Sequence, residues 1–210
     1  CYAAFGDDER PAPLWKVDVC ETRELLTADA SEGRKSRARH HLLTQAGDSV
    51  VYCSHSGLIV SVDGLRGTRN WAMRYPRREV AEPTDEPSLR DLCPPICAEG
   101  RLYVAPADSD RVLCLDLTTG VIYWQRDRLD VVHLLGVGRG RLLFTTWRNP
   151  GEGRVEAGGL RAVDALTGRD ENGWMLPDDG GGLVPFGRGL LIGDLVLWPT
   201  FRLPFGVVAV

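Results

Sequence analysis

The sequence predicts an all-β fold, a β-propeller of four-stranded antiparallel blades, and three observations support this prediction. The 210 residues include 24 glycines and 13 prolines, which favours frequent turns over long helices. Short runs rich in Val, Leu, Ile and Tyr, bounded by Gly, Asp, Ser or Pro, are typical of strands. A motif of aspartate, glycine and tryptophan recurs about every 50 residues, and four strands in roughly 40–50 residues is the period of a propeller blade.

Three copies of the motif are complete, within residues 60–71, 113–124 and 161–174. Their aspartates are 53 and then 48 residues apart, and a glycine follows each aspartate by four positions. Tryptophan follows by eight positions in two copies and by ten in the third, where we expect Asn172 and Gly173 to lengthen the turn. The motif residues are Asp63, Gly67 and Trp71; Asp116, Thr119, Gly120 and Trp124; and Asp164, Thr167, Gly168 and Trp174.

The same order of strands precedes each copy. An apolar run, a polar break and a second apolar run lead into the motif, and one strand before them and one carrying the tryptophan bring each repeat to about four strands. The paired runs are 50–53 with 58–60, 101–105 with 112–115, and 141–145 with 160–163, and the earlier strands include 42–43 and 131–132.

The motif residues suit a tight turn between two strands. An aspartate carboxylate accepts hydrogen bonds from turn amides, a threonine hydroxyl adds a local bond, and glycine adopts the positive φ that a side chain disfavours. Tryptophan buries a large apolar face between neighbouring blades while its indole N–H takes an acceptor. We therefore expect these residues to be structural.

The two ends of the chain also match the repeat. Residues 1–6 resemble the motif core, with Ala3 in the position of the aspartate, and Trp15 follows after a longer turn. Residues 206–210 match the strand that leads into a motif. We therefore expect residues 1–210 to be one propeller segment of about four blades, cut from a whole of seven or eight. Because Cys1 leads directly into a motif-like strand, we favour this over a lipid-anchored N-terminal cysteine.

Charge and hydropathy exclude two classes of function. A net charge of −4 gives no general reason to bind nucleic acid or an anionic membrane. The longest stretch without a charged residue is 14 residues, 49–62, whereas a membrane-spanning helix needs about 20 apolar residues. We expect no transmembrane segment in this chain.

No group of residues has the pattern of a catalytic or metal site, so we predict no catalytic, cofactor or metal residues in this segment. Three residues separate Cys93 from Cys97, whereas two separate the cysteines of a redox pair, and further zinc ligands are lacking; the disulfide state of the two cysteines is open. Asp108 and Asp110 resemble the start of a calcium loop, but the required glycine and distal glutamate are missing.

The histidines and remaining cysteines have structural interpretations. Adjacent His40 and His41 would point to opposite faces of a strand, so a solvated loop is favoured over a shared metal. His55 lies in a predicted hairpin turn, and His133 is expected to be a core residue. Cys53 and Cys114 are expected to be buried thiols.

The pattern Ala-x-Asp-x-x-Thr-Gly-x-x-x-Trp resembles the repeat of pyrroloquinoline-quinone (PQQ) propellers, most closely at 162–168 and 116–124. The first copy departs from it, with Gly64 beside the aspartate and Arg66 in place of threonine. The resemblance implies either a quinoprotein alcohol or sugar dehydrogenase or a non-enzymatic propeller, such as the lipoprotein of the outer-membrane β-barrel assembly machinery. Such enzymes hold PQQ with calcium and have a disulfide between adjacent cysteines. None of the six cysteines here are adjacent, and no Cys-x-x-Cys-His haem motif occurs.

We therefore favour a non-catalytic scaffold that binds a protein or polysaccharide through its loop faces. The longer connections 27–39 and 76–92 are the expected partner-facing loops. The alternatives are part of a PQQ-dependent dehydrogenase, with PQQ and calcium bound by the whole protein, and a sensor domain of a larger membrane or kinase protein. The resemblance implies a periplasmic or cell-envelope location.

Overall fold

The computed structural model describes residues 13–19, 42–54, 57–77, 93–127, 131–148, 156–175, 189–193, 195–199 and 207–209. These residues confirm the all-β prediction, because they form three four-stranded sheets and one three-stranded sheet, called blades 1 to 4 below. Among the described residues there is no helix of the length and apolarity that crossing a bilayer requires.

Each blade is an antiparallel meander, in which every strand pairs with the next one along the chain. Blade 1 contains β1 (Leu43–Ala46), β2 (Ser49–Cys53), β3 (Leu58–Asp63) and β4 (Arg69–Arg74). Blade 2 contains β5 (Ile96–Ala98), β6 (Arg101–Val104), β7 (Arg111–Asp116) and β8 (Ile122–Asp127). Blade 3 contains β9 (Val131–Gly138), β10 (Arg141–Arg148), β11 (Glu156–Asp164) and β12 (Asp170–Met175). Blade 4 contains β13 (Leu190–Ile192), β14 (Leu195–Pro199) and β15 (Val207–Ala209).

The first hairpin of each of blades 1 to 3 closes with a two-residue turn, which fixes the register. Ala46 pairs with Ser49, Ala98 with Arg101, and Gly138 with Arg141. In blades 2 and 3 both turn residues have positive φ, which matches the right-handed twist of the flanking strands. Even Glu99 and Arg139 adopt this conformation, with φ of 50° and 49°.

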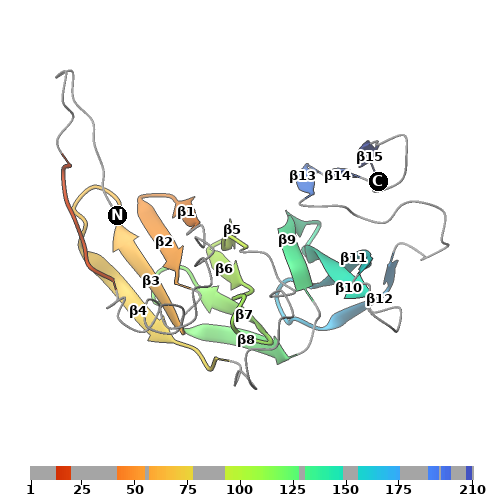
Figure 1. The fold of residues 1–210 in the computed structure, drawn as a ribbon, viewed down its shortest axis with the longest axis horizontal. Helices are drawn as coiled ribbons and strands as arrows, with labels where there is room; N and C mark the ends of the chain where they lie inside the picture. Colours follow the sequence, from red (N-terminus) through yellow and green to blue (C-terminus); the bar gives the residue numbers. More distant parts are fainter. Residues whose placement is uncertain are drawn as a thin grey trace, which may run out of the picture.

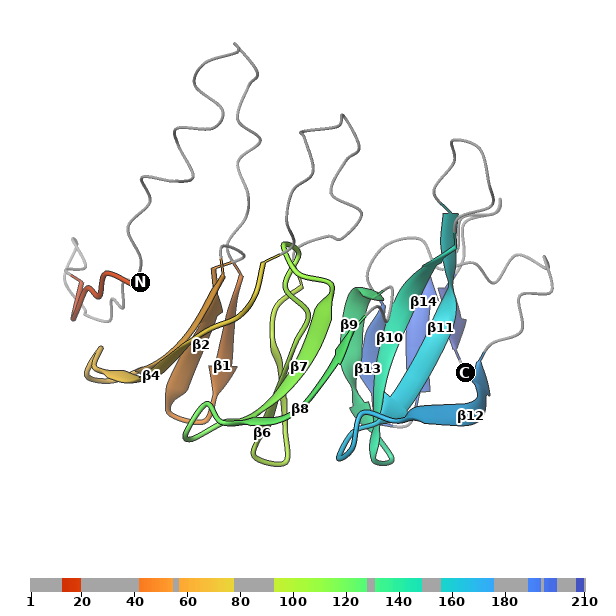
Figure 2. The same ribbon diagram turned by 90° about the horizontal axis from the view of Figure 1, so that it is seen from below.

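The blades lie side by side along an open arc (Figure 1). The first strands β1, β5, β9 and β13 follow one another along its inner side, and β4, β8 and β12 lie on the outer side. The turns that join the third and fourth strands lie together at one edge of the row, as Figure 2 shows from below. This arrangement brings each of these turns close to the outer strand of the preceding blade.

The hydrophobic core lies between the blades. Ile59, Trp71 and Leu113 belong to a cluster between blades 1 and 2, while Phe144 belongs to the cluster between blades 2 and 3. A third, smaller cluster joins β9, β10 and β11 to Val196 of blade 4. Because neighbours cover both of its faces, β7 is buried at four consecutive positions, the pattern of a continuously apolar strand.

A β-bulge precedes the tryptophan in blades 1 and 2, and it corrects one expectation for blade 3. In blade 1 Val62 pairs with Arg69 and Ser61 with Trp71, so one extra residue is looped out of β4. In blade 3 the longer spacing predicts a longer turn, but the turn closes with the same backbone hydrogen bonds as in blades 1 and 2, from Gly168 to Asp164 and from Asp164 to Arg169. The insertion instead enlarges the irregularity in β12, where Asp170 and Met175 pair with residues only two apart in β11.

Candidate functional site: the tryptophan-docked turns

Each turn between a third and a fourth strand folds around its aspartate. In blade 2, Oδ1 of Asp116 accepts hydrogen bonds from the amides of Thr118 and Thr119, at 3.0 and 2.7 Å, and from the Thr119 hydroxyl at 2.8 Å. The Gly120 amide donates to the Asp116 carbonyl at 2.9 Å, which closes the turn. The carboxylate therefore satisfies amides that the strand ladder leaves unpaired.

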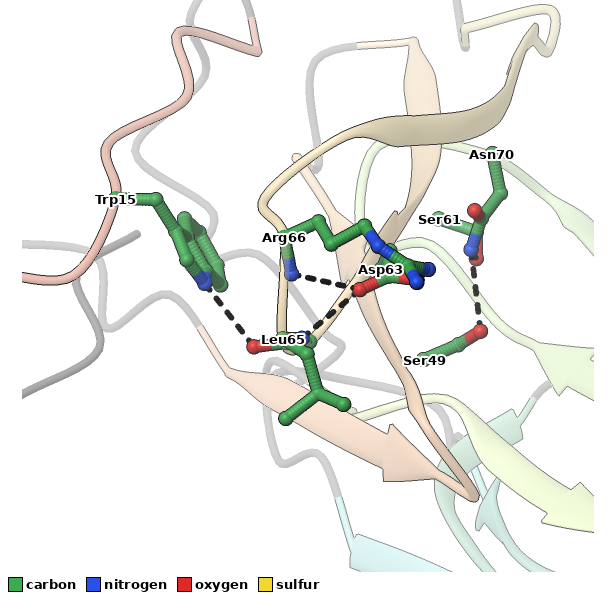
Figure 3. A network of polar contacts seen from close by, with 8 residues as sticks. Trp15, Ser49, Ser61, Asp63, Leu65, Arg66 and Asn70 are labelled. Carbon is green, nitrogen blue, oxygen red and sulfur yellow. Dashed lines mark hydrogen bonds and ion pairs between the residues drawn. The ribbon is translucent and has the colours of Figure 1, made fainter. Parts of the chain in front are cut away.

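Blades 1 and 3 repeat this turn with one difference. In blade 3 both the amide and the hydroxyl of Thr167 donate to Asp164 Oδ1, each at 2.7 Å. In blade 1 the amides of Leu65 and Arg66 donate to Asp63 Oδ1 at 2.9 and 2.7 Å (Figure 3). Arg66 has no hydroxyl to offer, and its Nη1 lies 3.4 Å from Asp63 Oδ2.

Hydrogen bonding holds the three carboxylates in the charged form. The Tyr123 hydroxyl, which donates to Asp116 Oδ2 at 2.6 Å, is the largest cause, followed by the Thr119 hydroxyl and amide, and together they lower the pKa of Asp116 to about 2. The Arg66 amide lowers the pKa of Asp63, and the Thr167 hydroxyl lowers that of Asp164. The aspartates act as fixed acceptors because these bonds favour the ionised form.

The three motif tryptophans whose side chains are described each dock on the turn of the following blade. Trp71 Nε1 of β4 donates to the carbonyl of Leu117 at 2.9 Å, and Trp124 Nε1 of β8 donates to that of Ala165 at 3.0 Å. Trp15, which precedes blade 1, donates to the carbonyl of Gly64 at 3.0 Å (Figure 3). The acceptor is in every case the residue directly after the motif aspartate.

The same acceptor residue is also fixed to its own blade. The amides of Gly64, Leu117 and Ala165 donate to the carbonyls of Asp48, Gly100 and Gly140, at 2.7, 3.0 and 2.8 Å. Those carbonyls belong to the two-residue hairpin turns between the first and second strands. The acceptor residue therefore bonds in two directions. Its amide binds the first hairpin of its own blade, and its carbonyl binds the tryptophan that precedes the blade.

The motif glycines provide the flat surface on which the indoles lie. Gly67, Gly120 and Gly168 have φ of +69°, +74° and +69°. A Cβ at any of the three would lie only 2.6 or 2.7 Å from a ring atom of Trp15, Trp71 or Trp124 respectively. Both the backbone conformation and the approach of the ring therefore require glycine.

The contact between blades 2 and 3 has additional polar bonds. The Tyr103 hydroxyl donates to the Ala165 carbonyl at 3.2 Å, so this carbonyl accepts from both Tyr103 and Trp124. Arg126 of β8 donates to the Gly168 carbonyl, and its Nη2 lies 3.0 Å from Asp170 Oδ2. Polar bonds therefore add to the tryptophan docking at this contact.

A second polar cluster joins blades 1 and 2 beyond the ends of β4 and β6. The Tyr75 hydroxyl donates to Asp108 Oδ1 at 2.6 Å, and Arg77 Nε lies 3.2 Å from Asp108 Oδ2. Ser109 donates to the Pro76 carbonyl at 2.9 Å. Burial raises the pKa of Tyr75, which keeps its hydroxyl protonated as a donor to the carboxylate.

The surroundings of Asp108 argue against a role as a calcium ligand. Its carboxylate is engaged by Tyr75 and Arg77, and a cationic guanidinium beside it opposes a metal ion. Within the described ranges, no three His, Cys, Asp or Glu side chains converge as a metal site requires. Asp108 therefore does not have the surroundings of a calcium ligand.

The predicted cysteine and histidine positions are structural where they are described. The Cys93 thiol donates to the Val132 carbonyl of β9 at 3.0 Å, whereas Cys97 packs against the cluster between blades 1 and 2, and no disulfide joins the two. Cys53 and Cys114 are buried, as expected. His133 is buried beside Thr145, with Nδ1 3.3 Å from Oγ1.

Most of the predicted motif residues lie in these turns, but the side chain of Trp174 lies outside the described part of the chain. The other predicted features outside the described part are residues 1–6, the loop 27–39, His40, His41 and His55. Of the connection 76–92, only Pro76 and Arg77 are described. The sequence signalled the indoles and the glycines, but it gave no signal for Tyr103 or Arg126, whose partners lie in another blade.

No protein-family model matches the sequence, and no curated protein matches it significantly. Solved structures do match. A europium-containing methanol dehydrogenase is 14% identical with a TM-score of 0.53, and the match covers 75% of this chain and 34% of that one. The quinohemoprotein alcohol dehydrogenase ADHIIG from Pseudomonas putida HK5 is 12% identical with a TM-score of 0.51, over 79% of this chain and 32% of that one. The fold is that of a PQQ-type β-propeller.

The computationally designed Ika4 protein is similar to this propeller as well, with 12% identity and a TM-score of 0.50, and the match covers 83% of this chain and 92% of that one. The propeller described here spans about a third of the length of the two dehydrogenases. At these identities the likeness establishes the fold alone.

Proposed function

We propose that this propeller is a non-catalytic scaffold that binds or assembles partners. The observation that carries the proposal is where the motif directs its polar groups. The carboxylates of Asp63, Asp116 and Asp164 accept from their own turns, and the described indoles donate to the next blade. The polar groups of the motif thus stabilise the turns and the contacts between blades, which leaves the loops to bind partners.

Protein or polysaccharide partners, bound through the loop faces, are part of the same proposal. So is a location in the bacterial periplasm or cell envelope, which follows from the resemblance of the repeat to exported propellers. Nucleic acid is not proposed as a partner, since the net charge of −4 supplies no phosphate-binding field.

A PQQ-dependent alcohol dehydrogenase is the second candidate, and the likeness to two such enzymes favours it. A sensor domain within a larger protein is a lesser one. The deciding experiment is to titrate the intact protein with PQQ and calcium, following absorbance and tryptophan emission, and to assay alcohol and sugar oxidation. We expect no spectral change and no turnover. Quinone-dependent oxidation would overturn the scaffold proposal.

A further inference from the structure

The fourth strands of blades 1, 2 and 3 occupy equivalent outer positions (Figure 1). Their charged residues differ. Blade 1 has Arg69 and Arg74 at the two ends of β4, with Arg66 before them and Arg77 after them, and no acidic residue lies within 66–77. The chain as a whole is acidic, so this is a local concentration of positive charge.

The outer strands of blades 2 and 3 neutralise their charges with nearby partners. Arg126 and Asp127 of β8 pair with Asp170 and Arg111, both at 3.0 Å. Glu171 of β12 pairs with Arg141 at 3.2 Å. Ion pairs thus account for the charged residues at these two edges.

On β4 two arginines are different. Arg66 and Arg77 lie beside Asp63 and Asp108, but no carboxylate among the described residues pairs with Arg69 or Arg74. Both are exposed, and of the residues between them Asn70 and Ala72 are exposed as well. Because Asn70 is looped out between them, the two arginines are four ladder positions apart, about 13 Å along a strand.

The backbone of β4 is also placed for a further partner. It is the last strand in its sheet, so one of its backbone edges faces away from β3. Ala72, midway between the arginines, adds only a methyl group to that surface. An extended peptide can approach such an edge and pair by strand addition.

We propose that the outer edge of β4 binds an acidic, extended protein segment, with Arg69 and Arg74 contacting its carboxylates and the strand edge pairing with its backbone. This inference rests on the proposed scaffold function and names the class of partner. Guanidinium groups favour carboxylates through bidentate charge-assisted hydrogen bonds, which gives the edge its selectivity.

Two other occupants fit the edge less well. A second copy pairing β4 with β4 would bring arginines toward arginines, which is unfavourable across paired strands. A nucleic acid would meet only two uncommitted arginines, far fewer than the six to ten phosphate contacts of a typical binder, on a protein whose net charge is −4.

Fluorescence anisotropy of the full chain with labelled peptides tests the proposal. The probe is a peptide about twelve residues long that alternates Glu with Val. The controls replace Glu by Lys, or keep the charge and insert Pro to prevent strand pairing. We expect binding of the Glu-Val peptide only, weakening as salt rises.

The double variant Arg69→Glu/Arg74→Glu should bind the Glu-Val peptide about tenfold more weakly, since each exposed ion pair contributes modestly. Arg169→Glu is the matched control, because Arg169 is an exposed arginine next to the turn of blade 3, and it should bind as the wild type does.

Other results overturn the proposal. Equal binding by all three proteins would place the site elsewhere, and equal binding of the Pro peptide would remove strand addition. Tighter binding of a single-stranded oligonucleotide, or a wild-type dimer that the double variant dissolves, would assign the edge to another occupant. Any of these results would overturn the proposed peptide site without bearing on the scaffold function. Only quinone-dependent oxidation would overturn the scaffold function, so the two proposals are tested independently.

Discussion

The indole N–H of Trp71 donates to the backbone carbonyl of Leu117, 2.9 Å away in the next blade, and the ring covers Gly120 of the same turn. Trp124 has the same relationship to Ala165 and Gly168. Each docked tryptophan therefore contributes one hydrogen bond and one buried aromatic face to the contact between blades.

Replacing Trp71 separates these two contributions. Trp71→Phe keeps most of the apolar area but removes the indole donor, and it should lower the free energy of unfolding by about 1 kcal/mol. Trp71→Ala also empties the space and should cost about 3–5 kcal/mol. Urea unfolding of both variants measures this difference. Leu65→Ala, at a side chain that is 76% exposed, is the control and should change little.

Two glycines of blade 2 form a matched pair. Gly100 and Gly120 have nearly the same φ, +72° and +74°, but a Cβ at Gly100 meets nothing within 4 Å, whereas one at Gly120 lies 2.7 Å from the Trp71 ring. Gly100→Ala should cost about 1 kcal/mol, for the backbone strain alone. Gly120→Ala should cost about 1–3 kcal/mol more, because the indole must move. Similar unfolding midpoints for the two variants would contradict the docked position of Trp71.

Acid should weaken the turn of blade 2 in a defined pH window. The folded pKa of Asp116, about 2, lies below its ordinary value of 3.8, so its contribution is present above pH 4 and is lost as the pH falls toward 2. Tyr123→Phe removes the largest cause, and the Asp116 carboxyl should then titrate closer to pH 4. Carbon NMR of the carboxyl resonance measures both values. An unchanged titration in Tyr123→Phe would show that the hydroxyl is not its partner.

Blade 1 offers a stabilising substitution. Thr119 and Thr167 each donate a hydroxyl to the motif aspartate, and Arg66 occupies the same position in blade 1. Arg66→Thr should add this bond and raise the free energy of unfolding by about 0.5–1 kcal/mol, exceeding the loss of an exposed ion pair. The urea midpoint should rise at constant slope. Thr119→Val, which removes the hydroxyl, should move the midpoint the other way.

The sequence predicted the blades because their determinants are local. Asp116, Thr119 and Gly120 lie within five residues and define a turn by their own chemistry, and the spacing of the apolar runs defines the strands. The docking acceptors could not be predicted, because Gly64, Leu117 and Ala165 contribute a backbone carbonyl that every residue type has. Tyr75 and Asp108 are 33 residues apart, and only the packing of blades shows that they bond. The two added residues near Trp174 were assigned to the turn, since a bulge within a strand leaves no residue signature.

Each docked indole N–H donates to a main-chain carbonyl, so the residue type at the accepting position is free to vary. A glycine, a leucine and an alanine serve equally at the accepting position within this one protein. Substitution at that position leaves the hydrogen bond between blades intact. A repeat can therefore be duplicated or exchanged without compensating side-chain changes in the neighbouring blade. The sequence of a repeat can therefore change widely while the contact between its blade and the neighbouring blade is retained.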